Sequence, residues 1–160
     1  MLKDNFNRTH DYLRISLTDA CNFRCLYCMP NEKMKFMPAK HLMQAEEMET
    51  IVKTFVDLGV KKIRLTGGEP LVRKDAKNII ERLSKYPVEL TLTTNAALVN
   101  EFIADFHRAG IKSVNVSLDT LKRDKFLKLS QRDLFDKAWN NIQLLITEGF
   151  HVKVNVVVMK

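Results

Sequence analysis

The feature that most constrains the fold is a regular alternation of strand-like runs with helix-like stripes. Short runs that are β-branched or alternate apolar with polar residues predict strands at 12–18, 62–66, 88–93, 111–118 and 152–158. Between them, apolar residues recur at helical spacing within 48–58, 98–106 and 138–146. Gly59, Gly110 and Gly149 each follow a stripe and precede a strand, where a left-handed residue ends a helix. Such alternation predicts a parallel sheet with right-handed crossovers.

Each predicted strand has one apolar and one polar face, because side chains alternate with a period of two. A closed barrel is filled with apolar side chains, and an ordinary parallel sheet is apolar on both faces. We therefore expect an α/β fold, an incomplete TIM-like (βα) barrel whose five or so parallel strands curve around a polar cavity. The polar positions are Arg14, Ser16, Thr18, Arg64, Thr66, Thr91, Thr93, Asn115, Ser117, Asp119, Lys153 and Asn155.

Three cations on this polar face come from three different strands, namely Arg14, Arg64 and Lys153. Their convergence favours a polyanionic ligand such as a nucleotide phosphate chain. Each of them taken alone also fits a solvated strand residue.

Composition narrows the class of protein further. The chain has 160 residues, a net charge of +7 and 46% hydrophobic residues, which suffices for a core without disulfides. The basic excess is interleaved with acids, so we expect no nucleic-acid partner. The longest apolar run is far too short to span a membrane, and we expect a cytoplasmic protein with no membrane partner.

The three cysteines, Cys21, Cys25 and Cys28, directly follow the first predicted strand. An odd, clustered set cannot pair completely and suits a reducing compartment. A structural zinc site needs a fourth ligand, and the histidines are scattered along the chain. Three thiolates on one loop instead suit a [4Fe-4S] cluster with one open iron site. The competing interpretation is three small buried residues.

A second motif, Thr66-Gly67-Gly68-Glu69-Pro70, ends the second strand, and its glycines allow close backbone approach. Together with the CxxxCxxC spacing and Tyr27 before the last cysteine, it resembles the radical S-adenosylmethionine (SAM) superfamily. Within that superfamily, similarity to the GTP 3′,8-cyclase (MoaA) family of molybdenum-cofactor biosynthesis extends over nearly the whole chain. The segments that carry it are 11–19, 63–66, 92–95, 115–119 and 152–157.

The resemblance implies a radical SAM lyase that converts GTP to (8S)-3′,8-cyclo-7,8-dihydroguanosine 5′-triphosphate through a 5′-deoxyadenosyl radical. It assigns no catalytic side chain. It implies that Cys21, Cys25 and Cys28 ligate the cluster, that Tyr27, Gly68 and Ser117 contact S-adenosylmethionine, and that Arg14, Arg64, Thr93 and Lys153 contact GTP. The implied partners are an electron donor such as flavodoxin or ferredoxin and the downstream cyclic pyranopterin monophosphate synthase (MoaC). The resemblance leaves open whether two copies of the chain form a homodimer.

Two departures and one missing region accompany the resemblance. The family commonly has arginine where this chain has Ala20 and glycine where it has Ala96. We expect residues 1–160 to form the N-terminal part of a radical SAM core domain, inactive alone, without the last strand and the C-terminal region that holds a second [4Fe-4S] cluster. The alternatives are another radical SAM enzyme that modifies a peptide or RNA, and a non-catalytic iron-sulfur binding fragment.

Overall fold

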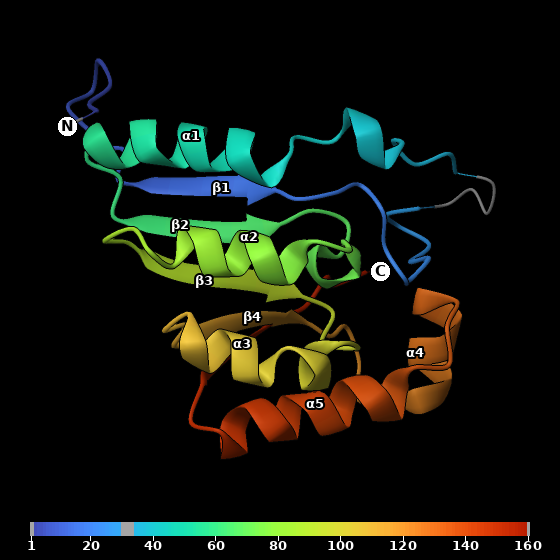
Figure 1. The fold of residues 1–160 in the computed structure, drawn as a ribbon. Helices are drawn as coiled ribbons and strands as arrows, with labels where there is room; N and C mark the ends of the chain where they lie inside the picture. The colour runs from blue at the N-terminus through green and yellow to red at the C-terminus, as the bar shows by residue number, and fades with distance from the viewer. Residues whose placement is uncertain (1, 30–33, 160) are drawn as a thin grey trace.

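The fold is one sheet of five parallel strands with helices in the crossovers (Figure 1). The structure is a computed structural model that describes residues 2–29 and 34–159. The strands follow chain order across the sheet: β1 (Tyr12–Ser16), β2 (Lys62–Thr66), β3 (Glu89–Thr94), β4 (Ser113–Ser117) and β5 (His151–Asn155). The helices are α1 (Ala45–Asp57), α2 (Ala76–Leu83), α3 (Ile103–Arg108), α4 (Arg123–Ser130) and α5 (Phe135–Thr147), with 3₁₀ turns η1 (Ala39–His41), η2 (Pro70–Val72) and η3 (Val99–Glu101).

The core lies between the apolar face of the sheet and the helices α1, α2, α3 and α5 (Figure 1). Ile63, Leu92 and Val114 are fully buried on the strand side. Burial alternates along β2 and β4, so the polar residues between them face away from the helices. The predicted class, an α/β partial barrel of parallel strands, is confirmed. In the part of the chain that the structure describes, no helix is long and apolar enough to cross a membrane.

The three predicted glycine helix ends are confirmed. Gly59, Gly110 and Gly149 have φ values of 101°, 65° and 84°. After each glycine, the next amide donates to a carbonyl five residues earlier, as in Val60 N to Phe55 O at 3.0 Å. This is the Schellman arrangement, which satisfies the last carbonyls of a helix and turns the chain into the next strand.

Two helices, α2 and α4, were not predicted from the sequence. The signal for α2 is present, since Ala76, Ile79, Ile80 and Leu83 have helical spacing and are all buried. The stripe 98–106 is only partly α-helical, because η3 precedes α3. The predicted start of the fourth strand at Ile111 is wrong, because β4 begins at Ser113. Ile111 N donates to Phe106 O at 3.0 Å, so this residue still belongs to the turn that ends α3.

The predicted fifth strand is too long at its end. Leu118 N donates to Asn155 O at 3.1 Å, but Val157 N donates to the Asp119 carboxylate at 2.9 Å. The Asp119 side chain thus takes the place of a backbone carbonyl of β4 as acceptor, and the hydrogen-bonded pairing of β4 with β5 ends at Asn155. β5 is an edge strand of this sheet, and its Val154 side chain is 46% exposed.

Candidate functional site

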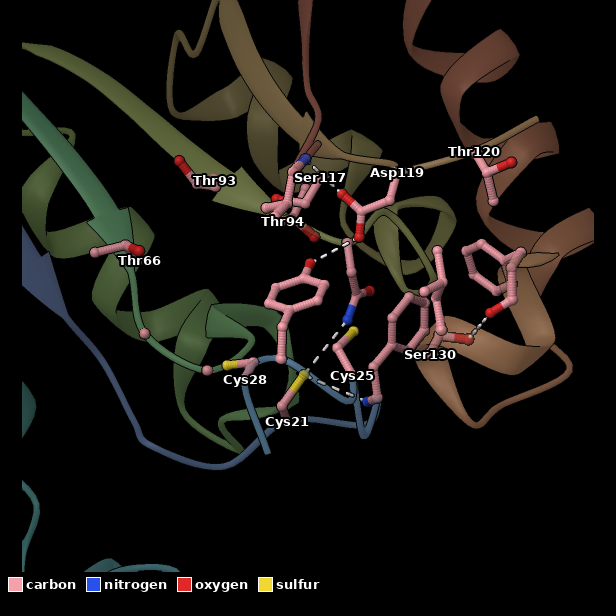
Figure 2. A pocket seen from close by; sticks show the side chains of 18 residues that line it. Cys21, Cys25, Cys28, Thr66, Thr93, Thr94, Ser117, Asp119, Thr120 and Ser130 are labelled. Atoms are coloured by element: carbon pink, nitrogen blue, oxygen red, sulfur yellow. Dashed lines mark hydrogen bonds between the residues drawn. The ribbon is translucent and has the colours of Figure 1, made fainter. Parts of the chain in front are cut away.

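A cavity of about 280 Å³ lies at the carboxyl ends of the strands (Figure 2). Because all five strands are parallel, the loops that follow them meet at this edge of the sheet. The cavity brings together Cys21, Cys25, Tyr27 and Cys28 after β1, Thr66, Gly67 and Gly68 at β2, Thr93, Thr94 and Asn95 at β3, Ser117, Asp119 and Thr120 at β4, Phe126, Leu129 and Ser130 of α4, and Phe23 and Val157.

The cysteine loop is anchored by its backbone. Arg24 N donates to Ser130 O at 2.9 Å and Leu26 N donates to Leu129 O at 3.0 Å, which fixes the loop to the end of α4. Cys28 N donates to Cys25 O at 2.9 Å and closes a tight turn. Cys21 and Cys25 are half-buried and Cys28 is exposed. All three thiols therefore line one cavity from a loop whose course is fixed by its neighbours.

The two half-buried thiols of this loop, Cys21 and Cys25, have raised pKa values. Burial raises the pKa of Cys25 to about 11, and negative charge at Cys21 and Asp119 acts in the same direction. Burial also raises the pKa of Cys21. A metal must displace these protons to bind. Among the described residues, no three His, Cys, Asp or Glu side chains group closely enough for a single metal ion. Three cysteines that line one cavity are the ligand type for a cluster of several irons.

The glycine turn after β2 packs directly on the cysteine loop. Gly67 has a φ of 145°, and a Cβ there would lie 2.3 Å from Thr18 O. A Cβ on Gly68 would lie 2.4 Å from Ala20 O. The backbone bonds Gly68 N to Thr18 O (2.7 Å) and Glu69 N to Ala20 O (2.8 Å) occupy this space. Both glycines are thus required for the two loops to meet, whatever ligand the cavity holds.

The Glu69 carboxylate joins the loops after β2 and β3. One oxygen accepts from Leu71 N (3.1 Å) and Thr94 Oγ1 (2.8 Å), and the other accepts from Asn95 N (2.7 Å). Glu69 is 1% exposed, and burial raises its pKa to about 7. These bonds give Glu69 a structural role beneath the cavity rather than a position from which it reaches a ligand.

A second carboxylate joins three elements at the opposite wall of the cavity. Asp119 accepts from the Tyr27 hydroxyl at 2.7 Å and from Val157 N at 2.9 Å (Figure 2). Burial of the phenol and this hydrogen bond to a carboxylate raise the pKa of Tyr27. The cysteine loop, the β4 exit and the segment after β5 are therefore tied at one point.

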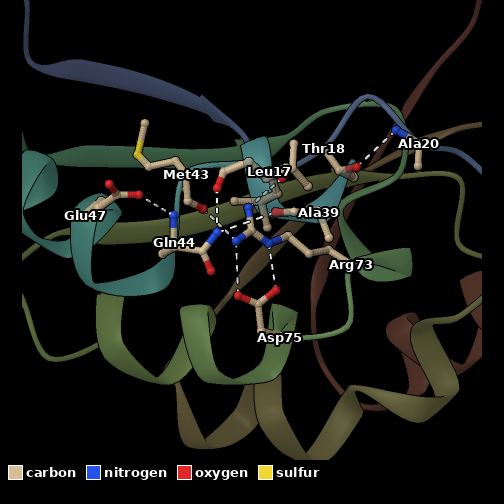
Figure 3. Close-up of polar contacts among 10 residues, drawn as sticks. Leu17, Thr18, Ala20, Ala39, Met43, Gln44, Glu47, Arg73 and Asp75 are labelled. Atoms are coloured by element: carbon tan, nitrogen blue, oxygen red, sulfur yellow. Dashed lines mark hydrogen bonds and ion pairs between the residues drawn. The ribbon is translucent and has the colours of Figure 1, made fainter. Parts of the chain in front are cut away.

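Arg73 fixes the exit of β1, the segment that leads into the cysteine loop (Figure 3). Its guanidinium donates to Leu17 O and Met43 O, each at 2.7 Å, and to both Asp75 carboxylate oxygens. Arg73 holds the pKa of Asp75 below its usual range. One buried side chain thus connects the exit of β1, the segment before α1 and the start of α2.

The predicted GTP contacts Arg14, Arg64, Thr93 and Lys153 lie on the polar face of the sheet. Of the four, Thr93 lines the cavity. Arg14 and Arg64 are register partners on β1 and β2, and Lys153 is the register partner of Asn115. Arg64 lies two residues before Thr66, which lines the cavity, and therefore shares its face.

These cations are not neutralised by neighbours. In residues 2–29 and 34–159, none of Arg14, Arg64 and Lys153 forms an ion pair with an acidic side chain. The guanidinium of Arg64 lies 5.8 Å from the centre of the Tyr12 ring, and its buried Nε has no hydrogen-bond partner. The three cations are spread along the face rather than gathered at the cavity wall.

Several residues of the site were not found from the sequence. Asn95 and the α4 residues Phe126, Leu129 and Ser130 line the cavity, and Asp119 was given no role. The position of Asn95 directly after a strand was the available signal. The sequence of α4 has only a weak helical pattern, because it contains few apolar residues. Its buried positions depend on contact with the cysteine loop, which the sequence does not reveal.

The sequence is similar to cyclases of molybdenum-cofactor biosynthesis. It is 48% identical over 162 residues to the GTP 3′,8-cyclase of Campylobacter lari, covering 100% of this chain and 50% of that protein. It is 47% identical to molybdenum cofactor biosynthesis protein moc-5 of Caenorhabditis elegans, covering 98% of this chain and 26% of that protein. The chain spans about half the length of the bacterial relatives it matches.

Solved structures share the fold at low sequence identity. SuiB of Streptococcus suis bound to S-adenosylmethionine superposes with a TM-score of 0.77 at 23% identity, covering 94% of this chain and 34% of that one. The structure of anSMEcpe with bound AdoMet gives 0.72 at 21% identity, covering 92% and 43%. The sequence profile of the Radical SAM superfamily matches residues 15–160. This chain belongs to the radical SAM superfamily.

Proposed function

We propose that residues 1–160 act as the radical SAM core of a GTP 3′,8-cyclase, the lyase that begins molybdenum-cofactor biosynthesis. One observation carries the proposal: three cysteines and a glycine turn share a cavity that adjoins a face with three unneutralised cations. The similarity to cyclases over the whole chain supports the choice of reaction.

Cys21, Cys25 and Cys28 would ligate a [4Fe-4S] cluster and leave one iron open. When bound, that cluster supplies an electron for the reductive cleavage of S-adenosylmethionine, and this chemistry belongs to the cofactors. The chain fixes the ligands by bonding the cysteine loop to α4 and to the glycine turn. Phe23 and Phe126 meet edge to face, with ring centroids 5.5 Å apart, and form an apolar wall that excludes water from the cavity.

S-adenosylmethionine would lie between the glycine turn and the β4 exit. Gly68 and Ser117 both line the cavity, as does Tyr27, which directly precedes Cys28 in the chain. The Tyr27 hydroxyl already donates to Asp119. Tyr27 would therefore contact the cofactor with its ring or backbone while Asp119 fixes its orientation.

GTP would lie along the polar face, with its phosphates toward Arg14, Arg64 and Lys153 and its ribose toward the cavity and Thr93. Arg14 and Arg64 are register partners on neighbouring strands, so two arginine side chains leave the same face of the sheet side by side. Like charges directly opposite each other on a sheet are unfavourable, and a polyanion bound by both would offset this cost. Holding the ribose in one orientation is worth several kcal/mol of the barrier, on the order of 7 or more in well-oriented systems.

The proposed reaction fixes the chemistry of the partners. It needs a one-electron donor such as flavodoxin or ferredoxin, and its product would pass to cyclic pyranopterin monophosphate synthase.

The proposal is tested by separating cluster binding from nucleotide binding. After anaerobic reconstitution with iron and sulfide, the chain should show the paramagnetic signal of a reduced four-iron cluster and should bind GTP in equilibrium titrations. Cys25→Ser should abolish the signal. Arg64→Ala should keep the signal and weaken GTP binding by about tenfold to a hundredfold, the range expected for one charged hydrogen-bonding group.

Arg108→Ala is the matched control, because this exposed arginine pairs with Asp105 on the helical side of the molecule. It should change neither measurement. A cluster that survives Cys25→Ser, or GTP affinity that is equal in the Arg64→Ala and Arg108→Ala variants, contradicts the proposal. A normal cluster without any GTP binding favours a radical SAM enzyme with a peptide or RNA substrate.

A further inference from the structure

Asn95 is the residue beside the cysteines whose role the proposed function does not use. It follows β3, is 8% exposed and lines the cavity with Cys21. Its Nδ2 lies 3.7 Å from Cys21 Sγ, a contact marked at the labelled Cys21 in Figure 2. The same nitrogen donates to Asn22 Oδ1 at 2.7 Å. The two protons of an amide nitrogen allow both bonds at once.

The orientation of this amide is fixed by its own oxygen. Asn95 Oδ1 accepts from Ala97 N at 3.0 Å, so the nitrogen necessarily points toward the cysteine loop. This bond requires the tight turn at Ala96, whose φ is 65°. Since Ala97 N is a donor only, a flipped Asn95 would place its nitrogen against another donor and lose the bond.

The backbone of Asn95 is held equally firmly. Its amide donates to Glu69 at 2.7 Å, and the preceding Thr94 hydroxyl donates to the same carboxylate at 2.8 Å. Glu69 in turn belongs to the glycine turn that packs on the cysteine loop. Asn95 is therefore preorganised, because every polar group it carries for this contact is fixed before any ligand binds.

We propose that Asn95 is a positioning residue that donates an N–H···S hydrogen bond to the Cys21 thiolate and raises the reduction potential of the cluster. The proposal rests on the cluster part of the proposed function and on no part of its substrate assignment. Phe23 N, 3.3 Å from the same sulfur, is a second donor. Reduction adds negative charge to the cluster and its thiolates, so donors to sulfur stabilise the reduced state.

The test is the reduction potential of the reconstituted chain, measured by a redox titration followed through the paramagnetic signal, without S-adenosylmethionine. In Asn95→Ser the hydroxyl can still accept from Ala97 N, but it is too short to reach the sulfur. We expect a more negative potential than in the unaltered chain. In Asn95→Asp an oxygen replaces the donor nitrogen, and we expect a still more negative potential.

Asn22→Ala is the matched control, because it removes the 2.7 Å bond between the loops and leaves the Asn95 amide beside Cys21. If Asn95 only ties the two loops together, Asn22→Ala shifts the potential as much as Asn95→Ser does, and the proposal is overturned. An unchanged potential in Asn95→Ser also overturns it. We expect the Asn22→Ala potential to match that of the unaltered chain.

A measurement without any change at Asn95 covers the case in which its variants fail to fold. With ¹⁵N-labelled asparagine in the Asn22→Ala chain, the reduced cluster should show hyperfine coupling to an asparagine nitrogen, and its absence overturns the proposal. Lack of any four-iron signal in the unaltered chain is a different result, since it refutes the cluster itself and this inference with it.

Discussion

Ala96 adopts a left-handed backbone conformation at a turn where glycine is common in the cyclases that this sequence resembles. Its φ is 65° and it is fully buried. A Cβ in this conformation costs roughly 1–2 kcal/mol, whereas glycine adds up to about 1 kcal/mol of entropy to the unfolded chain. We expect Ala96→Gly to raise the free energy of unfolding by about 0.5–1 kcal/mol, measured by urea denaturation under reducing conditions.

The neighbouring alanine provides the control for this prediction. Ala97 is equally buried but has no positive φ, so Ala97→Gly gains no relief of strain and should lower the free energy of unfolding. Equal effects of the two substitutions would show that the turn stores no strain at Ala96.

At the same scale, local type and spacing predicted several of the residues that line the cavity. Three cysteines on one loop and two glycines at a strand end could be assigned from local patterns. The roles of Asn95 and Asp119 could not, because each depends on contacts with residues far away in the chain, such as Asn22 and Val157. Arg14, Arg64 and Lys153 were placed on the correct face by alternation, but their distance from the cavity depends on strand register.

Among the elements, the exit of β1 is tied to two other segments by the side chain of Arg73. The side chain of Arg73 is 5% exposed, and its guanidinium donates to the carbonyl oxygens of Leu17 and Met43. In Arg73→Leu these carbonyls and Asp75 lose their partner, and we expect the free energy of unfolding to fall by about 3 kcal/mol. Chemical denaturation of the purified chain measures the loss.

Two further arginine variants serve as controls for the loss of stability in Arg73→Leu. Arg73→Lys keeps the charge but not the fork geometry, so its loss should be smaller. Arg82→Leu removes a guanidinium that also meets two carboxylates, Glu46 and Glu49, at the surface of α1 and α2, and should cost less than Arg73→Leu. If Arg82→Leu proves the more damaging change, Arg73 is not what holds the exit of β1 in place.

The elements themselves were predictable where periodicity and punctuation agree. Three helices end at the predicted glycines, and all five strands occur close to the predicted positions. The helix α2 was predictable, since Ala76, Ile79 and Leu83 have helical spacing, but it has only 8 residues and its stripe is short. The end of β5 was not predictable, since it is set by the contact between Val157 N and Asp119.

For the molecule as a whole, Glu69 makes stability depend on pH. Burial raises its folded pKa to about 7, above the ordinary value of 4.5. A carboxyl with a raised pKa stabilises the fold most below its unfolded pKa, and this contribution is lost as the pH rises toward 7. We expect the free energy of unfolding of the cluster-free, reduced chain to fall between pH 5 and pH 8 by up to about 3 kcal/mol.

Glu69→Gln separates this effect from other titrations. Glutamine stays neutral, and its amide nitrogen cannot accept from Asn95 N, so the variant should be less stable at pH 5 but nearly independent of pH. Denaturation curves across this pH window compare the two chains. Parallel pH profiles for both would mean that Glu69 is ionised throughout and that its three donors outweigh its burial.

The contact between Gly67, Gly68 and the backbone of Thr18, Ala20 and Asp19 has a consequence for the order of events during synthesis. The cysteine loop leaves the ribosome well before the glycine turn that supports it, because the turn follows the whole α1 crossover. Residues 66–69 supply the first support, and Leu129 and Ser130 of α4, which accept from Leu26 N and Arg24 N, supply the rest much later. Until then the three thiols of a nascent chain belong to an unsupported segment that is open to oxidation.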